Sequence, residues 1–128
     1  MDNIDKYIKV VSFLPFISTA LIIFFLSSIN KVELPDMGLD FTDKIIHILA
    51  YIVVGFTAFI LVEAIVTLKR NPKLMIYLSL ALSILYGIAD EIHQSFVPGR
   101  SADFWDVVAD SIGAAIGVFL THKTYKKF

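Results

Sequence analysis

Residues 86–110 read YGIADEIHQSFVPGRSADFWDVVAD, a dense group of polar side chains inside a chain that is otherwise apolar. Pro98 and Gly99 mark a turn, so we expect one helix to end and another to begin here. Ionisable side chains are costly in or near hydrocarbon and usually serve a function where they occur. We therefore expect the function to depend on the polar members of this stretch, which are Asp90, Glu91, His93, Gln94, Arg100, Asp103, Asp106 and Asp110.

The composition of the whole chain is that of an integral membrane protein. Its 128 residues are 57% hydrophobic and only 18% charged, which is too apolar for an ordinary soluble domain. One domain over residues 1–128 has room for about four spans of ~20 residues. The absence of cysteine excludes disulfides and thiolate chemistry. A net charge of -1 argues against nucleic acid as a partner.

The apolar runs predict an all-α, integral membrane four-helix bundle with spans at about 10–29, 43–68, 74–93 and 102–121. The first run is too long for a signal peptide, and we read it as an uncleaved span. The third must extend to His93 to cross the bilayer. The fourth must include three aspartates, unless it is a re-entrant helix. Thr42 and Ser101 are the expected N-caps of the second and fourth spans.

Lysine and arginine set the expected orientation. Eight of them flank the two ends of the chain and the middle loop, whereas Lys31, Lys44 and Arg100 lie on the other side. The positive-inside rule then predicts cytoplasmic N and C termini. The polar stretch is expected at the extracytoplasmic face of a multi-pass protein of the cell membrane.

Helical periodicity places the polar groups of three spans at a common depth. In the fourth span they share one stripe with two glycines, because the steps between them are three and four residues: Asp103, Asp106, Asp110, Gly113 and Gly117. His47, Tyr51 and Gly55 form a similar stripe in the second span, with Asp43 one turn above. The third span supplies Glu91 and Gln94. We predict an acidic, partly desolvated pocket that is open to the outside, with Lys44 and Arg100 as counter-charges.

At these residues the sequence resembles the VanZ-like family of small bacterial membrane proteins, which is named for a teicoplanin-resistance protein. The resemblance covers nearly the whole chain. It rests on Asp43-Lys44-x-x-His47-x-x-x-Tyr51, Tyr86-Gly87-x-x-Asp90-Glu91-x-His93-Gln94, Phe96-Val97-Pro98-Gly99-Arg100, and Asp103, Asp106, Asp110, Gly113 and Gly117, with Ser27 and Ser28 also fitting. It implies a role at the cell envelope and an association with antibiotic resistance to the lipid-tailed glycopeptide teicoplanin. Family members often carry asparagine in place of Asp110, which argues against a role that demands a carboxylate there.

Candidate site residues fall into two groups, each with a structural alternative. Asp90, Glu91 and His93 are candidate catalytic acids and bases, or else a network that fixes the third span to the turn. Arg100 could clamp a phosphate or form a salt bridge to Asp103 or Glu91. The candidate binding residues are Asp43, Lys44, His47, Tyr51, Gln94, Arg100, Asp103, Asp106 and Asp110. For Asp43, Lys44 and His47 the structural alternative is a helix cap, an interfacial lysine and a buried, hydrogen-bonded histidine.

Three functions fit these residues. The first is a cell-envelope protein that engages a lipid-linked cell-wall precursor or a lipoglycopeptide, with membrane lipids as its other partners. The second is a non-catalytic scaffold for a cell-wall synthesis partner. A proton-coupled carrier is disfavoured because the inner halves of the spans are nearly all apolar.

No cofactor is assigned. His47, His93 and the carboxylates would suit zinc or manganese, but no HExxH-like pair on one helix supports a metal site. Whether the protein is an enzyme and its oligomeric state are left open.

Overall fold

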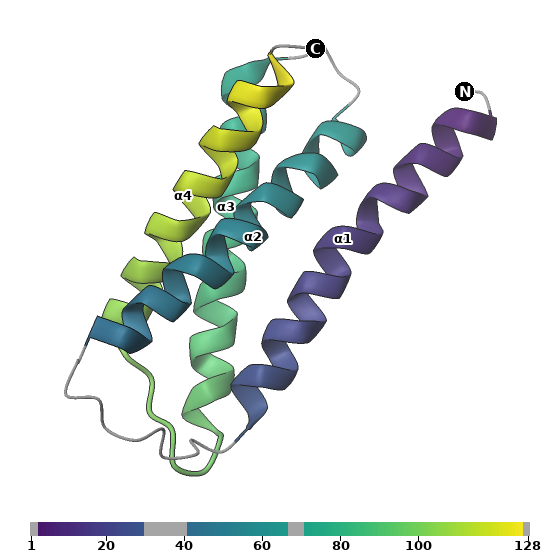
Figure 1. Ribbon diagram of the computed structural model, residues 1–128. Coiled ribbons are helices and arrows are strands. Elements are labelled where there is room, and N and C mark those ends of the chain that lie inside the picture. Colours follow the sequence, from purple (N-terminus) through teal and green to yellow (C-terminus); the bar gives the residue numbers. More distant parts are fainter. Residues whose placement is uncertain (1–2, 30–40, 67–70, 127–128) are drawn as a thin grey trace.

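The computed structural model describes residues 3–29, 41–66 and 71–126 (Figure 1). These residues form four helices, α1 (Asn3–Ser28), α2 (Phe41–Ile65), α3 (Pro72–Ser95) and α4 (Phe104–Tyr125). Each is long and apolar enough to cross a membrane. The expected all-α fold of four membrane helices is therefore confirmed.

The helices run alternately up and down (Figure 1). The beginning of α1 and the end of α4 lie at one end of the bundle. The end of α1, the beginning of α2 and the turn between α3 and α4 lie at the other. Both described chain ends therefore lie on the same side, as four crossings require; that this side is cytoplasmic remains a prediction.

The helix starts differ from those expected in two places. Asp103, rather than Ser101, is the N-cap of α4, and its carboxylate accepts a hydrogen bond of 2.8 Å from the Trp105 N–H. The N-cap lies two residues later because the Asp103 N–H donates to the Glu91 carboxylate at 2.8 Å, which holds Asp103 in an extended conformation before the helix. Thr42 lies inside α2, which begins at Phe41.

The fourth span is one continuous helix rather than a re-entrant one. Its 22 residues extend for ~33 Å, about the thickness of the hydrocarbon layer. The three aspartates of the sequence stripe therefore stand at its N-cap and in its first two turns.

Glycines bring α2 and α4 into backbone contact. A Cβ atom on Gly113 would lie 3.0 Å from the Ile48 Cα, and one on Gly55 would lie 2.9 Å from the Ala114 Cα. Gly117 is equally closely opposed by the backbone of α2. The glycine stripe of α4 therefore packs against α2, and the aspartates on the same stripe face α2 as well.

Candidate functional site

Polar side chains from all four helices meet at the end of the bundle where α1 ends and α2 and α4 begin. Six of them are buried, with at most 6% of the residue exposed: Ser27, Asp90, Glu91, Gln94, Asp106 and Asp110. Such groups are stable in a membrane protein only if their neighbours satisfy them. Their contacts divide into an α2–α4 network and an α1–α3 network.

The α2–α4 network pairs a lysine and a histidine with three carboxylates. Lys44 of α2 donates to Asp103 at 2.6 Å and also to Asp106. One turn further along α2, His47 Nδ1 lies 2.8 Å from Asp110 Oδ1. His47 Nε2 lies 3.7 Å from Asp106 Oδ2, which is too far for a hydrogen bond. Each cationic or imidazole group of α2 therefore faces a carboxylate on the stripe of α4.

Asp103 lies outside the membrane-spanning helices, at the rim of this network. The hydrogen bond from the Lys44 ammonium group lowers the pKa of the Asp103 carboxyl below its usual value, and the hydrogen bond from the Trp105 N–H acts in the same direction. Asp103 is therefore held as a carboxylate, which suits both its pairing with Lys44 and its capping of α4.

The α1–α3 network is built around Asp90. Its Oδ1 lies 2.6 Å from the Ser27 hydroxyl and its Oδ2 accepts a hydrogen bond of 3.1 Å from the Gln94 amide. Arg100 donates to the Gln94 side chain at 3.3 Å and to the Ile29 carbonyl at 3.0 Å. Arg100 therefore ties the α3–α4 turn to the end of α1. Neither a clamped phosphate nor a salt bridge to Asp103 or Glu91 is needed to explain this position.

His93 belongs to the edge of the α1–α3 network. Its Nε2 lies 2.8 Å from the Ser28 hydroxyl, and its ring stacks on Phe24 with ring centroids 4.5 Å apart. Asp90, Glu91 and His93, which are close in sequence, thus turn to three different partners. The structure does not bring these three candidate catalytic residues to one point.

Glu91 connects the two networks. One of its oxygens accepts the hydrogen bond from the Asp103 backbone, and the carboxylate interacts electrostatically with Asp106, His47 and Asp110. Glu91 lies on α3, whereas those residues lie on α2 and α4. Glu91 therefore adds α3 to the polar contacts between α2 and α4.

Three buried polar atoms have no hydrogen-bond partner among the residues that the structure describes: the Tyr51 hydroxyl, Glu91 Oε1 and Asp110 Oδ2. Gly87 lies beside two of these groups, because a Cβ atom there would stand 3.2 Å from both Tyr51 Cε1 and Asp110 Oδ2. Electrostatic interactions also connect Tyr51 with Asp110 and Glu91. The unsatisfied atoms thus belong to one interior region that could accept further hydrogen bonds.

The serines at the end of α1 were given no role in the site by sequence reasoning. Ser27 and Ser28 contact Asp90 and His93 and bring α1 into the polar group. Two adjacent hydroxyls at the end of the first apolar run, at the depth expected for the end of the third, are the signal that could have indicated them.

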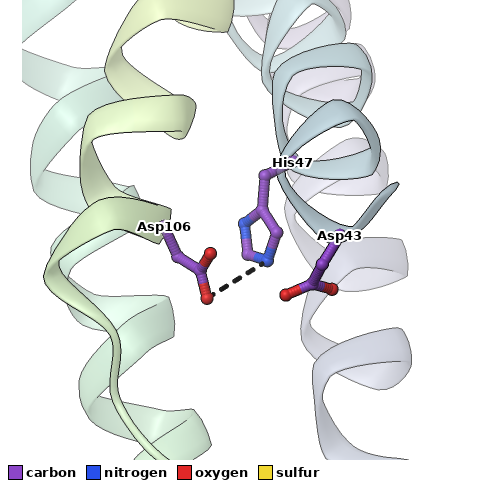
Figure 2. A group of neighbouring side chains, drawn as sticks. All are labelled: Asp43, His47 and Asp106. Carbon is purple, nitrogen blue, oxygen red and sulfur yellow. Dashed lines mark ion pairs between the residues drawn. The ribbon is translucent and has the colours of Figure 1, made fainter. Parts of the chain in front are cut away.

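Three potential metal ligands lie close together within the α2–α4 network. Asp43 and His47, one turn apart on α2, face Asp106 of α4 (Figure 2), and one potential ligand atom of each lies within 4.8 Å of the others. The spacing of ligands within one helix could not indicate this group, because its third member comes from another helix.

Four apolar helices with a cluster of polar side chains at one end of the bundle define a small multi-pass membrane protein. The model of the VanZ/LLP1 family matches residues 2–124, nearly the whole chain. The chain belongs to this family. The comparisons with curated proteins and with solved structures gave no match.

Proposed function

We propose that this protein acts in the bacterial cell envelope, where the polar group between its helices engages the head group of lipid-linked wall material or of a lipoglycopeptide of the teicoplanin type. The proposal places this group at the outer leaflet, as the distribution of lysine and arginine predicts. Engagement would alter the availability of the bound molecule at the membrane surface.

One observation carries the proposal. Within the described residues, one atom each of Tyr51, Glu91 and Asp110 is buried without a hydrogen-bond partner, and polar groups that remain unsatisfied inside a membrane protein are costly. A head group rich in hydroxyl, amide and phosphate groups would offer both donors and acceptors to such atoms. The side chain of Lys44, 25% exposed at the rim, is the cation nearest to an entering anionic group in the α2–α4 network.

The alternative is a non-catalytic scaffold that binds a wall-synthesis partner. The hydrogen bonds of Ser27, Gln94 and Arg100 favour it, because they fix the α3–α4 turn and the end of α1 as one rigid surface. Under this alternative the interior carboxylates serve the fold and need no ligand.

Glu91→Gln separates the two functions. Glutamine keeps an oxygen that can accept the Asp103 N–H, so the α3–α4 turn should stay in place while the charge is lost. Glu63→Gln, at the opposite end of α2, is the matched control. Each variant and the natural chain would be produced in a teicoplanin-susceptible bacterium, with the amount of protein in the membrane measured by immunoblot.

The proposal predicts that the natural chain and Glu63→Gln lower susceptibility to teicoplanin but not to a glycopeptide without a lipid tail, and that Glu91→Gln abolishes the effect at equal abundance. Full activity of Glu91→Gln would support the scaffold instead. Unchanged susceptibility with the natural chain present in the membrane would contradict a role toward the lipoglycopeptide.

A further inference from the structure

We infer that Asp43, His47 and Asp106 form a binding site for one divalent transition-metal cation. This site goes beyond the proposed function and does not depend on it. Figure 2 shows the His47 ring between the two carboxylates, with its Nε2 directed toward Asp106. One imidazole nitrogen and two carboxylate oxygens are a ligand set that suits Zn²⁺.

Asp110 fixes the orientation of the His47 ring through Nδ1, the nitrogen that does not face Asp106. Its Nδ1 lies 2.8 Å from Asp110 Oδ1, and Asp110 is only 1% exposed. With the Asp110 carboxylate as acceptor, Nδ1 carries the hydrogen of this bond, and loss of the proton on Nε2 when a metal binds would leave that nitrogen with a free lone pair. Metal-binding histidines commonly have this arrangement, in which a carboxylate holds the ring nitrogen that does not bind the metal.

The distance between His47 Nε2 and Asp106 Oδ2 is close to the distance between two ligand atoms of one metal ion. Nε2 and Asp106 Oδ2 are 3.7 Å apart, beyond a hydrogen bond. Two ligand atoms with bonds of about 2.1 Å to a tetrahedral Zn²⁺ ion are about 3.4 Å apart. A shift of a few tenths of an ångström brings these two atoms to that spacing. A ligand atom of Asp43 lies within 4.8 Å of the other two, so a rotation of this exposed side chain would complete the site. The two residues of α2 need no change of register because they are one helical turn apart.

One oxygen of Glu91, close to the site, also lacks a hydrogen-bond partner among the residues that the structure describes. Glu91 is 4% exposed, and its Oε1 has no hydrogen-bond partner among the described residues. Its carboxylate interacts electrostatically first with Asp106 and then with His47. Among the described residues, this carboxylate oxygen is buried without a partner and its group interacts with two of the three ligands, which points to a cation, because a positive charge would offset the cost of burying it.

The fixed charges of the α2–α4 network leave the site negative. Lys44 is shared between Asp103 and the other oxygen of Asp106, Oδ1. No lysine or arginine in the part of the chain that the structure describes forms an ion pair with Asp43, Glu91 or Asp110. A divalent cation would offset the charges of its two carboxylate ligands, Asp43 and Asp106, without displacing Lys44.

The test is a calorimetric titration of the purified, tag-free chain in mild detergent with ZnCl₂ alone. The metal content of the chain is then measured after gel filtration. We expect one Zn²⁺ per chain. Asp43→Asn, a change at an exposed position that should leave the fold intact, and His47→Gln should each weaken binding at least about tenfold. His122→Gln, at the other end of the bundle, is the control and should bind like the natural chain.

Failure of the natural chain to retain stoichiometric Zn²⁺ would overturn the inference, and so would unchanged affinity of Asp43→Asn. The Asp43 variant decides the question even if His47→Gln does not fold. Because the titration contains neither wall precursor nor glycopeptide, its failure would leave the proposed function standing, and the reverse also holds.

Discussion

His47 Nδ1 and Asp110 Oδ1 lie 2.8 Å apart and join α2 to α4 within the buried part of the bundle. The next residue on this face of α4 is Gly113, where the backbones of α2 and α4 touch. The polar pair and the glycine contact are therefore neighbours along one helix interface. The close approach of the glycines sets the position of the carboxylates, and the carboxylates fix the alignment of the glycines.

The first prediction concerns the nature of the His47–Asp110 contact. Asp110→Asn keeps an acceptor for His47, so its free energy of unfolding should lie within about 0.5 kcal/mol of that of the natural chain. Asp110→Leu leaves the imidazole unpartnered and should lower the free energy of unfolding by about 1–2 kcal/mol. Equilibrium unfolding in mixed micelles would measure both. Equal stability of the leucine variant would show that the contact adds nothing.

The second prediction concerns the glycine stripe. Gly117→Leu should destabilise the bundle by more than about 2 kcal/mol, because the backbone of α2 leaves no room for a side chain. Ala89→Leu introduces the same side chain at an exposed position of α3 and serves as the control. Thermal unfolding in detergent would compare them. The tight α2–α4 contact would be wrong if the two variants had the same melting temperature.

The fold was predictable because its signals are local. Apolar runs give the number of helices, and the steps of three and four residues from Asp103 to Gly117 placed these residues on one face of the fourth span. The structure turns that face toward α2. The start of α4 was not predictable from caps alone. Ser101 is a good N-cap by type, but the bond from the Asp103 N–H to Glu91 depends on where α3 ends in space.

The third prediction concerns α1. Ser27→Ala removes the hydroxyl partner of Asp90 and should cost about 1 kcal/mol, with faster hydrogen exchange at the end of α1 than in the natural chain. Ser18→Ala, at an exposed position of the same helix, should change neither. Hydrogen exchange followed by mass spectrometry would show whether protection is lost at the end of α1. Identical exchange in both variants would remove Ser27 from the site.

The fourth prediction is a pH dependence. Because the Lys44 hydrogen bond lowers the pKa of Asp103 in the folded protein, this carboxylate stabilises the fold above its unfolded pKa of about 3.9 and the stabilisation is lost as the pH falls through the lower, folded pKa. Asp103→Asn keeps an N-cap but has no such contribution at any pH.

The natural chain should therefore lose more stability than Asp103→Asn between about pH 6 and about pH 3. Melting temperatures of both proteins across this range are the measurement. Parallel curves would mean that the pairing of Asp103 with Lys44 does not contribute to stability.

The site was only partly predictable. Residue type and depth indicated that His47, Asp106 and Asp110 would meet, and the structure brings them together. The separate partners of Asp90 and Glu91 could not be predicted from the sequence. The two residues are adjacent in the chain, but Asp90 contacts α1 and Glu91 contacts the start of α4. Arg100 has the charge of an anion-binding residue, yet its partners, Ile29 and Gln94, are set by the path of the turn.

The most direct test of the proposed function is native mass spectrometry of the natural chain, Glu91→Gln and Glu63→Gln, each released from mild detergent in the presence of a purified lipid-linked wall precursor. The account predicts one bound precursor on the natural chain and on Glu63→Gln, and none on folded Glu91→Gln. Retention by all three proteins, or by none, would contradict the claim that the polar group between the helices binds the head group.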